Sequence, residues 1–462
     1  MGPRKLFGTD GVRGIVNSDL TPEVVLRLSL AIGTVFGPGS RIVVGSDARA
    51  GSGFVTKLVV GGLMSTGAKV YEAGLVPTPA LQYYVKTEGF DGGVMVTASH
   101  NPPEYCGIKV VMADGVEAPS EVEEEIERVY QEGGFRRAQW RQVPQDSTRV
   151  HDVVERYVDG VVSLVDVDRI RKLGIKVVVD PANSVGALST PKLLRALGAG
   201  VVTVNGDLSP VPSRNPEPSQ DNLGYLMEAV RATGASFGVA HDGDADRAIF
   251  VADDGRYVPG DISAVLLCSH IAENRGERSP PRVVTAVSST TLVSKLLSRY
   301  GIEVIWTRVG SIVISRTMMR IGAIAGFEEN GGFMYPRHQY VRDGAMALAL
   351  MAELLSYEDA PLSNLLDALP RRYVVKKRVY VDRAALPRVY ERVKELFRGA
   401  EFVEVDGIKA ITERFWFLVR PSGTEPLVRV FVEAETEELA NEVLKGLVDV
   451  FVEVYGSEVR IA

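Results

Sequence analysis

One pattern of apolar residues occurs three times along this 462-residue chain. In each copy, short runs rich in Val and Ile alternate with stretches long enough for an α-helix. The runs lie at 41–45, 69–73 and 92–97, at 175–180, 200–204 and 236–240, and at 282–287, 302–307 and 322–326. Such alternation predicts mostly parallel strands joined by crossover helices, and ligands of these sheets bind beyond the carboxyl ends of the strands. We therefore expect three related α/β domains in tandem, with mixed, mostly parallel sheets.

The segment after about residue 371 has a different pattern. It begins with the strand-like run RYVVKKRVYV and ends in a helical stretch near 435–455, in which apolar residues share one face. We expect a smaller α+β domain here, because a chain of this length is too long for one compact core. The predicted domains are residues 1–150, 151–255, 256–370 and 371–462, with the active site in a central cleft.

Net charge, apolar stretches and cysteine content limit the partners and the compartment that we expect for this protein. The net charge is −7 at pH 7, so the chain offers no broad basic face to a nucleic acid or an anionic membrane. No stretch reaches the roughly 20 apolar residues of a membrane span, and the start of the chain has no apolar signal core. The two cysteines, Cys106 and Cys268, lie far apart, which favours a reducing, cytoplasmic compartment. The sequence does not indicate whether the protein is a monomer or a homo-oligomer.

The loop that closes each α/β copy is rich in glycine and polar residues. These loops read TASHNPP at 97–103, HDGDADR at 241–247 and FEENGG at 327–332. Because each follows the last strand of its copy, these are the places where we expect ligand-binding residues.

The second loop carries three carboxylates that alternate with small residues. A curved loop could aim Asp242, Asp244 and Asp246 at one point, where they would repel one another without a cation. The plainer alternative is a solvated acidic turn. The position at the end of a strand favours a divalent metal site, and oxygen ligands favour Mg²⁺.

The C-terminal stretch RPSGTEPLVR, residues 420–429, supplies the opposite charge. Arginine guanidinium groups can bind phosphate oxygens in pairs, and the hydroxyls and closely spaced backbone N–H groups between them complete an anion site. The candidate residues are Arg420, Ser422, Gly423, Thr424 and Arg429. A proline-bounded surface turn is the alternative. Arg13, in the glycine-rich stretch FGTDGVRG, could also approach an anion, although such a turn needs no function.

Ser99 and His100 adjoin in the first loop. Neighbouring residues seldom point together and the chain lacks a G-x-S-x-G elbow, so an acyl-transfer triad is not expected. A serine before Asn-Pro is most often a turn or cap residue. Next to a metal loop and a phosphate-binding loop, however, Ser99 fits the role of a phosphate carrier.

Four stretches together resemble the α-D-phosphohexomutase superfamily. TASHNPPEYCGIK, DGDADR, EENGG and RPSGTEPLVR occur in this order over essentially the whole chain. The likeness is to prokaryotic phosphomannomutase/phosphoglucomutase and to phosphoglucosamine mutase. The resemblance implies a phosphoserine at Ser99 and one Mg²⁺ ion per subunit, bound by the phosphoserine and the three aspartates. It also implies hexose 1,6-bisphosphate as an activator.

The resemblance also implies roles for single residues. His100, Lys109, Arg13 and Arg247 fall on catalytic positions around the phosphoserine, with Lys109 as a candidate acid/base or charge-stabilising group. Glu328 and Asn330 fall on the loop that binds sugar hydroxyls. The residues that fall on the loop for the non-transferring phosphate are Arg420, Ser422, Gly423, Thr424 and Arg429.

The implied reaction interconverts hexose 1-phosphates and hexose 6-phosphates. Phosphoserine would donate its phosphoryl group to the free hydroxyl, and the bisphosphate would then turn over and return its other phosphoryl group. Mannose and glucose phosphates rank first as substrates, with glucosamine phosphate as the alternative. A sugar-phosphate phosphatase and a non-catalytic sensor rank behind both.

Overall fold

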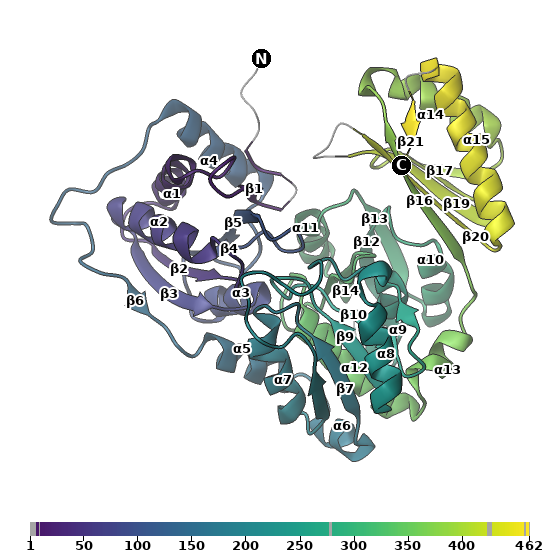
Figure 1. The fold of residues 1–462 in the computed structure, drawn as a ribbon, viewed down its shortest axis with the longest axis horizontal. Coiled ribbons are helices and arrows are strands. Elements are labelled where there is room, and N and C mark those ends of the chain that lie inside the picture. Colours follow the sequence, from purple (N-terminus) through teal and green to yellow (C-terminus); the bar gives the residue numbers. More distant parts are fainter. Residues whose placement is uncertain (1–5, 9, 277–279, 423–426, 457–458, 462) are drawn as a thin grey trace.

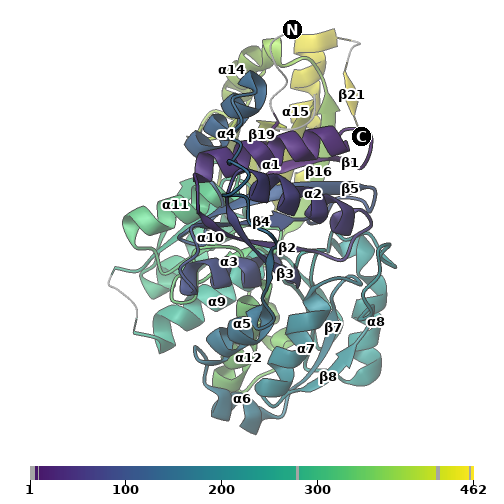
Figure 2. The ribbon, with the colours of Figure 1, turned by 90° about the vertical axis from the view of Figure 1, so that its left-hand side faces the viewer.

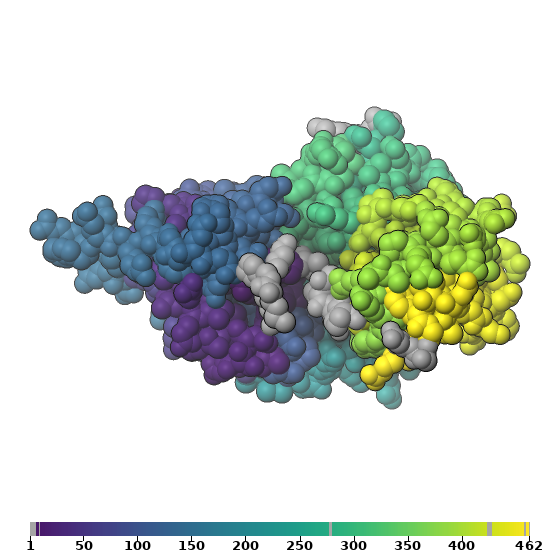
Figure 3. Space-filling model, turned by 90° about the horizontal axis from the view of Figure 1, so that it is seen from above, coloured from purple at the N-terminus to yellow at the C-terminus, as the bar shows by residue number. Residues whose placement is uncertain are grey.

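The computed structural model describes residues 6–8, 10–276, 280–422, 427–456 and 459–461. These residues form four β-sheets with helices packed against them (Figure 1). The purple and blue N-terminal part and the yellow C-terminal part lie at opposite ends of the molecule, as the view from above also shows (Figure 3). In the described part of the chain, no helix is both long and apolar enough to cross a membrane.

The first sheet has its strands in the order β1-β5-β4-β2-β3-β6. The strands are β1 Val12–Ile15, β2 Arg41–Ser46, β3 Lys69–Leu75, β4 Gly92–Val96, β5 Tyr105–Met112 and β6 Thr148–Arg149, and the helices are α1 Pro22–Phe36, α2 Ser52–Ser65, α3 Thr78–Thr87 and α4 Ser120–Glu132. β2 pairs in parallel with β3 and β4, whereas β5 runs antiparallel to β4 and β1. Successive residues of β2 point to opposite faces. Ile42 and Val44 therefore pack with α1, α2 and α4, while Val43 packs with α3.

The second sheet follows the order β11-β10-β9-β7-β8. Its strands are β7 Lys176–Asp180, β8 Gly200–Thr203, β9 Phe237–Ala240, β10 Ile249–Ala252 and β11 Tyr257–Val258, and the helices around it are α5 Val153–Val162, α6 Val167–Leu173, α7 Gly186–Ala196 and α8 Gly224–Thr233. β7 is parallel to β8 and β9, and β10 is antiparallel to β9. Figure 2 shows α5, α6 and α7 below the helices of the first sheet.

The third sheet has the order β13-β12-β14-β15. Its strands are β12 Arg282–Ala286, β13 Glu303–Thr307, β14 Ala325–Phe327 and β15 Phe333–Met334, and its helices are α9 Gly260–Asn274, α10 Leu292–Leu297, α11 Ser311–Ile321, α12 Gly344–Glu358 and α13 Leu362–Asp367. Helix α12 is apolar around most of its circumference, and residues 344–356 are buried. It packs against α6, α7 and α9, so it joins the second and third sheets through one continuous core.

The fourth sheet is antiparallel and has the order β17-β18-β19-β20-β16-β21. Its strands are β16 Tyr373–Tyr380, β17 Glu401–Val403, β18 Ile408–Ile411, β19 Phe415–Pro421, β20 Val428–Ala434 and β21 Arg460–Ile461, and its helices are α14 Leu386–Leu396 and α15 Glu437–Tyr455. Both helices pack on this sheet and form a separate core with it. We call this sheet with its two helices the C-terminal unit.

The predicted fold class is confirmed, with three α/β units of mixed sheets and a smaller α+β unit. The strand expected at 322–326 instead begins at Ala325. Gly322 ends α11 in the left-handed conformation, with φ of +64°, so the chain becomes extended only after it. The boundaries at residues 150, 255 and 370 stay predictions.

Candidate active site

Ser99 lies in the loop after β4 and is fully buried. Its φ is +52°, in the left-handed region that residues with a Cβ seldom adopt. Two hydrogen bonds hold this conformation: the Ser99 N–H donates to Thr97 Oγ1 at 2.8 Å, and Arg49 Nη2 donates to the Ser99 carbonyl at 2.5 Å. The loop thereby aims Ser99 Oγ at Asp242 Oδ2, to which it donates at 2.7 Å.

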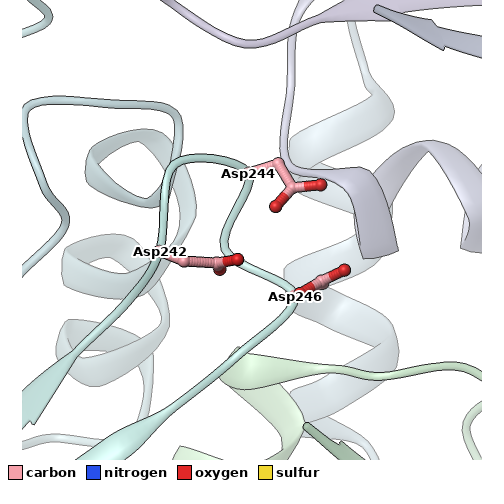
Figure 4. A group of neighbouring side chains, drawn as sticks. All are labelled: Asp242, Asp244 and Asp246. Atoms are coloured by element: carbon pink, nitrogen blue, oxygen red, sulfur yellow. The ribbon is translucent and has the colours of Figure 1, made fainter. Parts of the chain in front are cut away.

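Asp242, Asp244 and Asp246 lie on the loop between β9 and β10 (Figure 4). All three are buried, and one carboxylate oxygen of each lies within 4.8 Å of the others. Burial, together with Asp246 and Asp244, raises the pKa of Asp242 well above its usual range. Among the described residues, Asp244 Oδ1 and Asp246 Oδ1 are buried without a hydrogen-bond partner. Unsatisfied carboxylate oxygens in a compact group fit the ligand set of a divalent cation such as Mg²⁺.

Lys109, on β5, neutralises part of this charge. Its Nζ lies 3.1 Å from Asp244 Oδ2, 3.3 Å from Asp246 Oδ2 and 3.2 Å from Asp10 Oδ2. Burial lowers the pKa of Lys109, but the three carboxylates outweigh burial and hold its pKa above the usual value. The side chain is therefore placed as a fixed positive charge beside the aspartate loop.

Arg247 and His100 form a second basic group. Arg247 Nη2 donates to His100 Nδ1 at 2.9 Å, and Arg247 Nη1 donates to Glu217 Oε1 at 3.0 Å. His100 Nδ1 also lies 3.2 Å from Ser99 Oγ. Burial, followed by the charge of Arg247, lowers the pKa of His100. The imidazole is consequently neutral and keeps Arg247 directed toward Ser99.

Arg13 approaches the same loop from β1. Its Nη1 donates to Asn101 Oδ1 at 2.7 Å, two residues after Ser99, and its guanidinium pairs with Asp10. The structure therefore brings all of the predicted catalytic residues around Ser99 and the aspartate loop.

The predicted sugar-binding loop follows β14. Glu328 is buried, and burial raises its pKa, whereas Asn330 Oδ1 accepts the Gly332 N–H at 3.2 Å. Gly331 has φ of +91°, and a Cβ there would lie 2.7 Å from the Ala248 carbonyl. Only glycine lets this loop lie so close to the end of the aspartate loop.

Arg342, which precedes α12, links the predicted sugar-binding loop to the loop that carries the three aspartates. Its Nη2 lies 2.7 Å from Asp246 Oδ2 and 3.1 Å from Asp10 Oδ2, and its Nη1 lies 3.4 Å from Glu328 Oε2. One guanidinium thus fixes carboxylates from three distant segments relative to one another.

The predicted phosphate-binding loop lies in the C-terminal unit. Arg420 on β19 and Arg429 on β20 lie opposite each other in the ladder. Arg420 Nε donates to Asp406 Oδ2 at 2.6 Å, and the Ser422 N–H donates to the Leu427 carbonyl at 2.8 Å, which closes the base of the loop. The predictions for Gly423 and Thr424 lie outside the described residues. The described members of this loop come from β19, β20 and the residue after β19, in a different unit from β4, which precedes Ser99 (Figure 1).

Comparison with known families covers all four units. The chain matches phosphoglucomutase/phosphomannomutase alpha/beta/alpha domain I over residues 4–137, domain II over 155–255, domain III over 259–373 and the C-terminal domain over 375–450. The chain belongs to the phosphohexomutase family. Its identification as a phosphohexomutase from the four motifs is therefore confirmed.

Individual relatives of this phosphohexomutase match over almost their whole length. A phosphoglucosamine/phosphogalactosamine mutase of Sulfurisphaera tokodaii is 51% identical over 96% of this chain and 98% of its own. A phosphoglucomutase/phosphomannomutase of Thermococcus kodakarensis is 39% identical over 96% and 97%. The crystal structure of a putative phosphomannomutase from Thermus thermophilus superposes with a TM-score of 0.84 at 27% identity, over 98% of this chain and 100% of that one.

Five further residues contact the predicted site residues but were not themselves predicted: Asp10, Arg49, Thr78, Glu217 and Arg342. Thr78 Oγ1 donates to Asp244 Oδ2 at 2.7 Å. Asp10 lies in the glycine-rich stretch FGTDGVRG, and Arg49 lies in GSDAR at the end of a strand. Both are positions at which a polar residue could have been proposed for the site from sequence. Glu217 stands between two prolines in an irregular loop, and Arg342 follows no pattern, so only the fold reveals these two.

Proposed function

We propose that this phosphohexomutase moves a phosphoryl group between the O1 and O6 positions of a hexosamine phosphate through phosphorylated Ser99. The observation that carries the proposal is the buried Ser99 Oγ held 2.7 Å from Asp242 Oδ2, beside two further buried carboxylates. A buried serine fixed in a strained loop is oriented as a reacting group, since a capping serine needs neither feature.

Phosphoryl transfer would proceed in two halves. In the first, the bond from phosphorus to Ser99 Oγ breaks while a bond to the free sugar hydroxyl forms, and the proton that the hydroxyl loses ends on the departing Ser99 Oγ. In the second, the bisphosphate presents its other end and its phosphoryl group returns to Ser99. A hexosamine 1,6-bisphosphate would therefore also prime the unphosphorylated enzyme.

The residues around Ser99 suit this reaction. Asp242, Asp244 and Asp246 with Ser99 would hold one Mg²⁺ ion, which when bound would neutralise charge on the transferring phosphoryl group. Lys109 supplies fixed positive charge beside Asp244 and Asp246, and Arg247 supplies it beside His100. Arg13 donates to Asn101, two residues after Ser99.

The other end of the substrate would contact two loops. Glu328 and Asn330 would bind sugar hydroxyls, and Arg420, Ser422, Gly423, Thr424 and Arg429 would bind the phosphate that is not transferred. A phosphate at the far end looks alike in both orientations of the bisphosphate, so this loop can serve both halves of the reaction.

The choice of hexosamine rests on relatives. The 51% identical relative is named for glucosamine and galactosamine phosphates, and the 39% identical one for glucose and mannose phosphates. We therefore place glucosamine and galactosamine phosphates first and keep glucose and mannose phosphates as the second candidates. The two cysteines are buried free thiols, which supports a reducing, cytoplasmic setting within this proposal.

A panel of substrates tests the proposal. Purified enzyme with Mg²⁺ and a trace of hexose 1,6-bisphosphate is offered the 1-phosphates of glucosamine, galactosamine, glucose and mannose, and 6-phosphates and free phosphate are measured. We expect conversion to be fastest for a hexosamine and absent in Ser99→Ala. Release of free phosphate would indicate a phosphatase, and binding without turnover would indicate a sensor.

A further inference from the structure

The seam between the third sheet and the C-terminal unit is built around a buried lysine. A small apolar cluster fills the seam, with Val287 from the loop after β12 and Trp416 and Leu418 from β19 at its centre. Partly buried side chains surround these three residues: Trp306, Val309, Val403, Ile411 and Phe431. An apolar seam between two units needs no lysine, yet Lys409 of β18 lies within it, 1% exposed.

Lys409 binds both sides of the seam. Its Nζ donates to the carbonyls of Val287 and Ser289, at 2.8 and 2.7 Å. The same Nζ lies 4.3 Å from the ring centroid of Trp306 and 4.1 Å from that of Trp416, one tryptophan from each unit. Burying an amine costs free energy unless the amine is hydrogen-bonded. Here two carbonyls accept its hydrogen bonds, and two aromatic rings pack against it.

The carbonyls that Lys409 binds belong to the loop after β12, which supports the sugar-binding loop. Between them, Ser288 Oγ donates to Glu329 Oε2 at 2.7 Å. Glu329 directly follows Glu328. In the same loop, Thr290 Oγ1 donates to Glu433 Oε1 of β20 at 2.6 Å, so the C-terminal unit contacts this loop twice.

The segment that leads into Lys409 contacts the phosphate-binding arginine. Asp406 Oδ2 accepts from Arg420 Nε at 2.6 Å and from the Val309 N–H, after β13, at 3.1 Å. Gly407 has φ of +81°, and a Cβ there would lie 2.3 Å from the Val419 carbonyl. Glycine is therefore required for the segment to lie flat against β19 while the side chains at both of its ends, Asp406 and Lys409, reach across the seam.

We propose that residues 406–409 form a docking segment that fixes the phosphate-binding arginine relative to the sugar-binding loop, with Lys409 as its positioning residue. The proposal rests on the proposed function, because it assigns the two ends of one sugar phosphate to the two loops. Lys409 itself would contact neither end of the sugar phosphate. It acts by holding the loop at 287–290 and the C-terminal unit in one arrangement.

Tryptophan fluorescence tests the docking directly. The chain has three tryptophans, and two of them flank Lys409. The third, Trp140, is 80% exposed, so Trp140→Phe leaves an emission signal from the seam alone. This variant is compared with the double variant Trp140→Phe/Lys409→Met. We expect the loss of Lys409 to shift the tryptophan emission maximum to longer wavelength and to increase quenching of this emission by acrylamide. Lys445→Met, at an exposed position of α15, is the matched control and should leave both readings unchanged.

Steady-state kinetics test the consequence for substrate. In Lys409→Met we expect KM for the sugar phosphate to rise about tenfold while kcat changes by less than about threefold, since Lys409 does not touch the reacting atoms. A lysine that only stabilised the fold would lower the melting temperature and leave KM unchanged, and this result would overturn the proposal. Unchanged fluorescence would overturn it as well.

A second variant keeps the test independent of folding. Asp406 is partly exposed, with a side chain 20% accessible, so Asp406→Asn leaves the apolar seam in place while weakening the bond to Arg420. It should raise KM in the same direction, and an unchanged KM would count against the docking segment. If the wild type converts no sugar phosphate, the proposed function fails, whereas the fluorescence comparison still decides whether Lys409 docks the C-terminal unit.

Discussion

Ser99 Oγ donates a 2.7 Å hydrogen bond to Asp242 Oδ2, and the two residues are separated by 143 positions in the chain. Both side chains are buried, and each comes from the loop that follows a strand of its own sheet. The distance between these atoms is therefore set by how the first and second sheets pack together. Small changes at the contact between the two loops should alter reactivity without removing any reacting group.

Gly243 is the residue at that contact. A Cβ at this position would lie 2.5 Å from the Ser99 carbonyl and 3.0 Å from Arg49 Nη2. We expect Gly243→Ala to displace the Ser99 loop, to lower kcat about 100-fold and to destabilise the fold by about 1–3 kcal/mol. Mutase assays and urea unfolding measure the two effects.

Gly53→Ala is the matched control for this substitution. A Cβ there meets nothing within 4 Å, and the position lies in helix α2, so we expect full activity and stability equal to or above that of the wild type. Full activity in Gly243→Ala would contradict the importance of the loop contact.

Removing one carboxylate from the aspartate loop should lower activity without lowering the thermal stability of the metal-free protein. The raised pKa of Asp242 means that its ionised form costs folding free energy, and this cost grows as pH rises through that pKa. At pH 8 without metal, Asp242→Asn should therefore melt at or above the wild-type temperature, yet its activity should fall about 100-fold.

The same variant tests the metal site by calorimetry. With Mg²⁺ at 100 times its Kd, the wild type should gain about 2.7 kcal/mol of stability, and Asp242→Asn should gain almost none. Asp254→Asn, an exposed aspartate in the next turn, should behave as the wild type. An equal Mg²⁺ effect in Asp242→Asn would show that the metal binds elsewhere.

Arg342 should contribute strongly to the free energy of unfolding, because it pairs with three carboxylates. Replacing it with Met leaves Asp246, Asp10 and Glu328 without its guanidinium, and a broken buried ion pair costs about 3–5 kcal/mol. Lys109 still contacts Asp246 and Asp10, but Glu328 has no such substitute among the described residues. Glu328→Gln should therefore recover part of the loss in an Arg342→Met background, as urea unfolding of the two single variants and the double variant would show. Strictly additive losses would contradict this coupling.

Much of the fold could be predicted because it rests on local patterns. The β-branched runs mark the strands, and the loop after each last strand lies where parallel sheets place their ligands. For this reason Ser99 and the three aspartates could be proposed as one site from the sequence. The resemblance to the phosphohexomutases then indicated Lys109 and Arg247, which the structure places beside them.

The residues that could not be predicted act across units. Arg342 and Glu217 gain their partners only when segments far apart in sequence pack together, and nothing in their local sequence indicates that. Lys409 looks like an ordinary charged residue of an amphipathic strand until the two tryptophans around it are seen. Local patterns carry no information about such long-range contacts.

Docking of the C-terminal unit should depend on pH. Burial lowers the pKa of Lys409 to about 7 from an ordinary value of 10.5, against the opposing charges of Glu433 on β20, Asp261 on α9 and Glu329 in the sugar-binding loop. A released Lys409 would take up a proton between these two values, so docking is favoured as pH rises through this window and weakens as pH falls through it toward about 7.

We expect KM of the wild type to rise relative to that of Lys409→Met as pH is lowered from about 9 to about 7. Burial also raises the pKa of Asp261 to about 7, so Asp261→Asn should be assayed in parallel and should retain the effect. Identical pH profiles of KM in the wild type and Lys409→Met would contradict this prediction.

Phosphorylation of Ser99 by a sugar bisphosphate is the most direct test of the proposed function. Enzyme freed of phosphate is mixed with a ³²P-labelled hexosamine 1,6-bisphosphate and Mg²⁺, and the label is located by peptide mass spectrometry before and after a chase with unlabelled sugar monophosphate. We predict label on Ser99 that the chase removes into bisphosphate, no label in Ser99→Ala, and normal labelling in the exposed-site control Ser298→Ala. Turnover of sugar phosphate by a wild type that never carries label on Ser99 would contradict the phosphoserine mechanism.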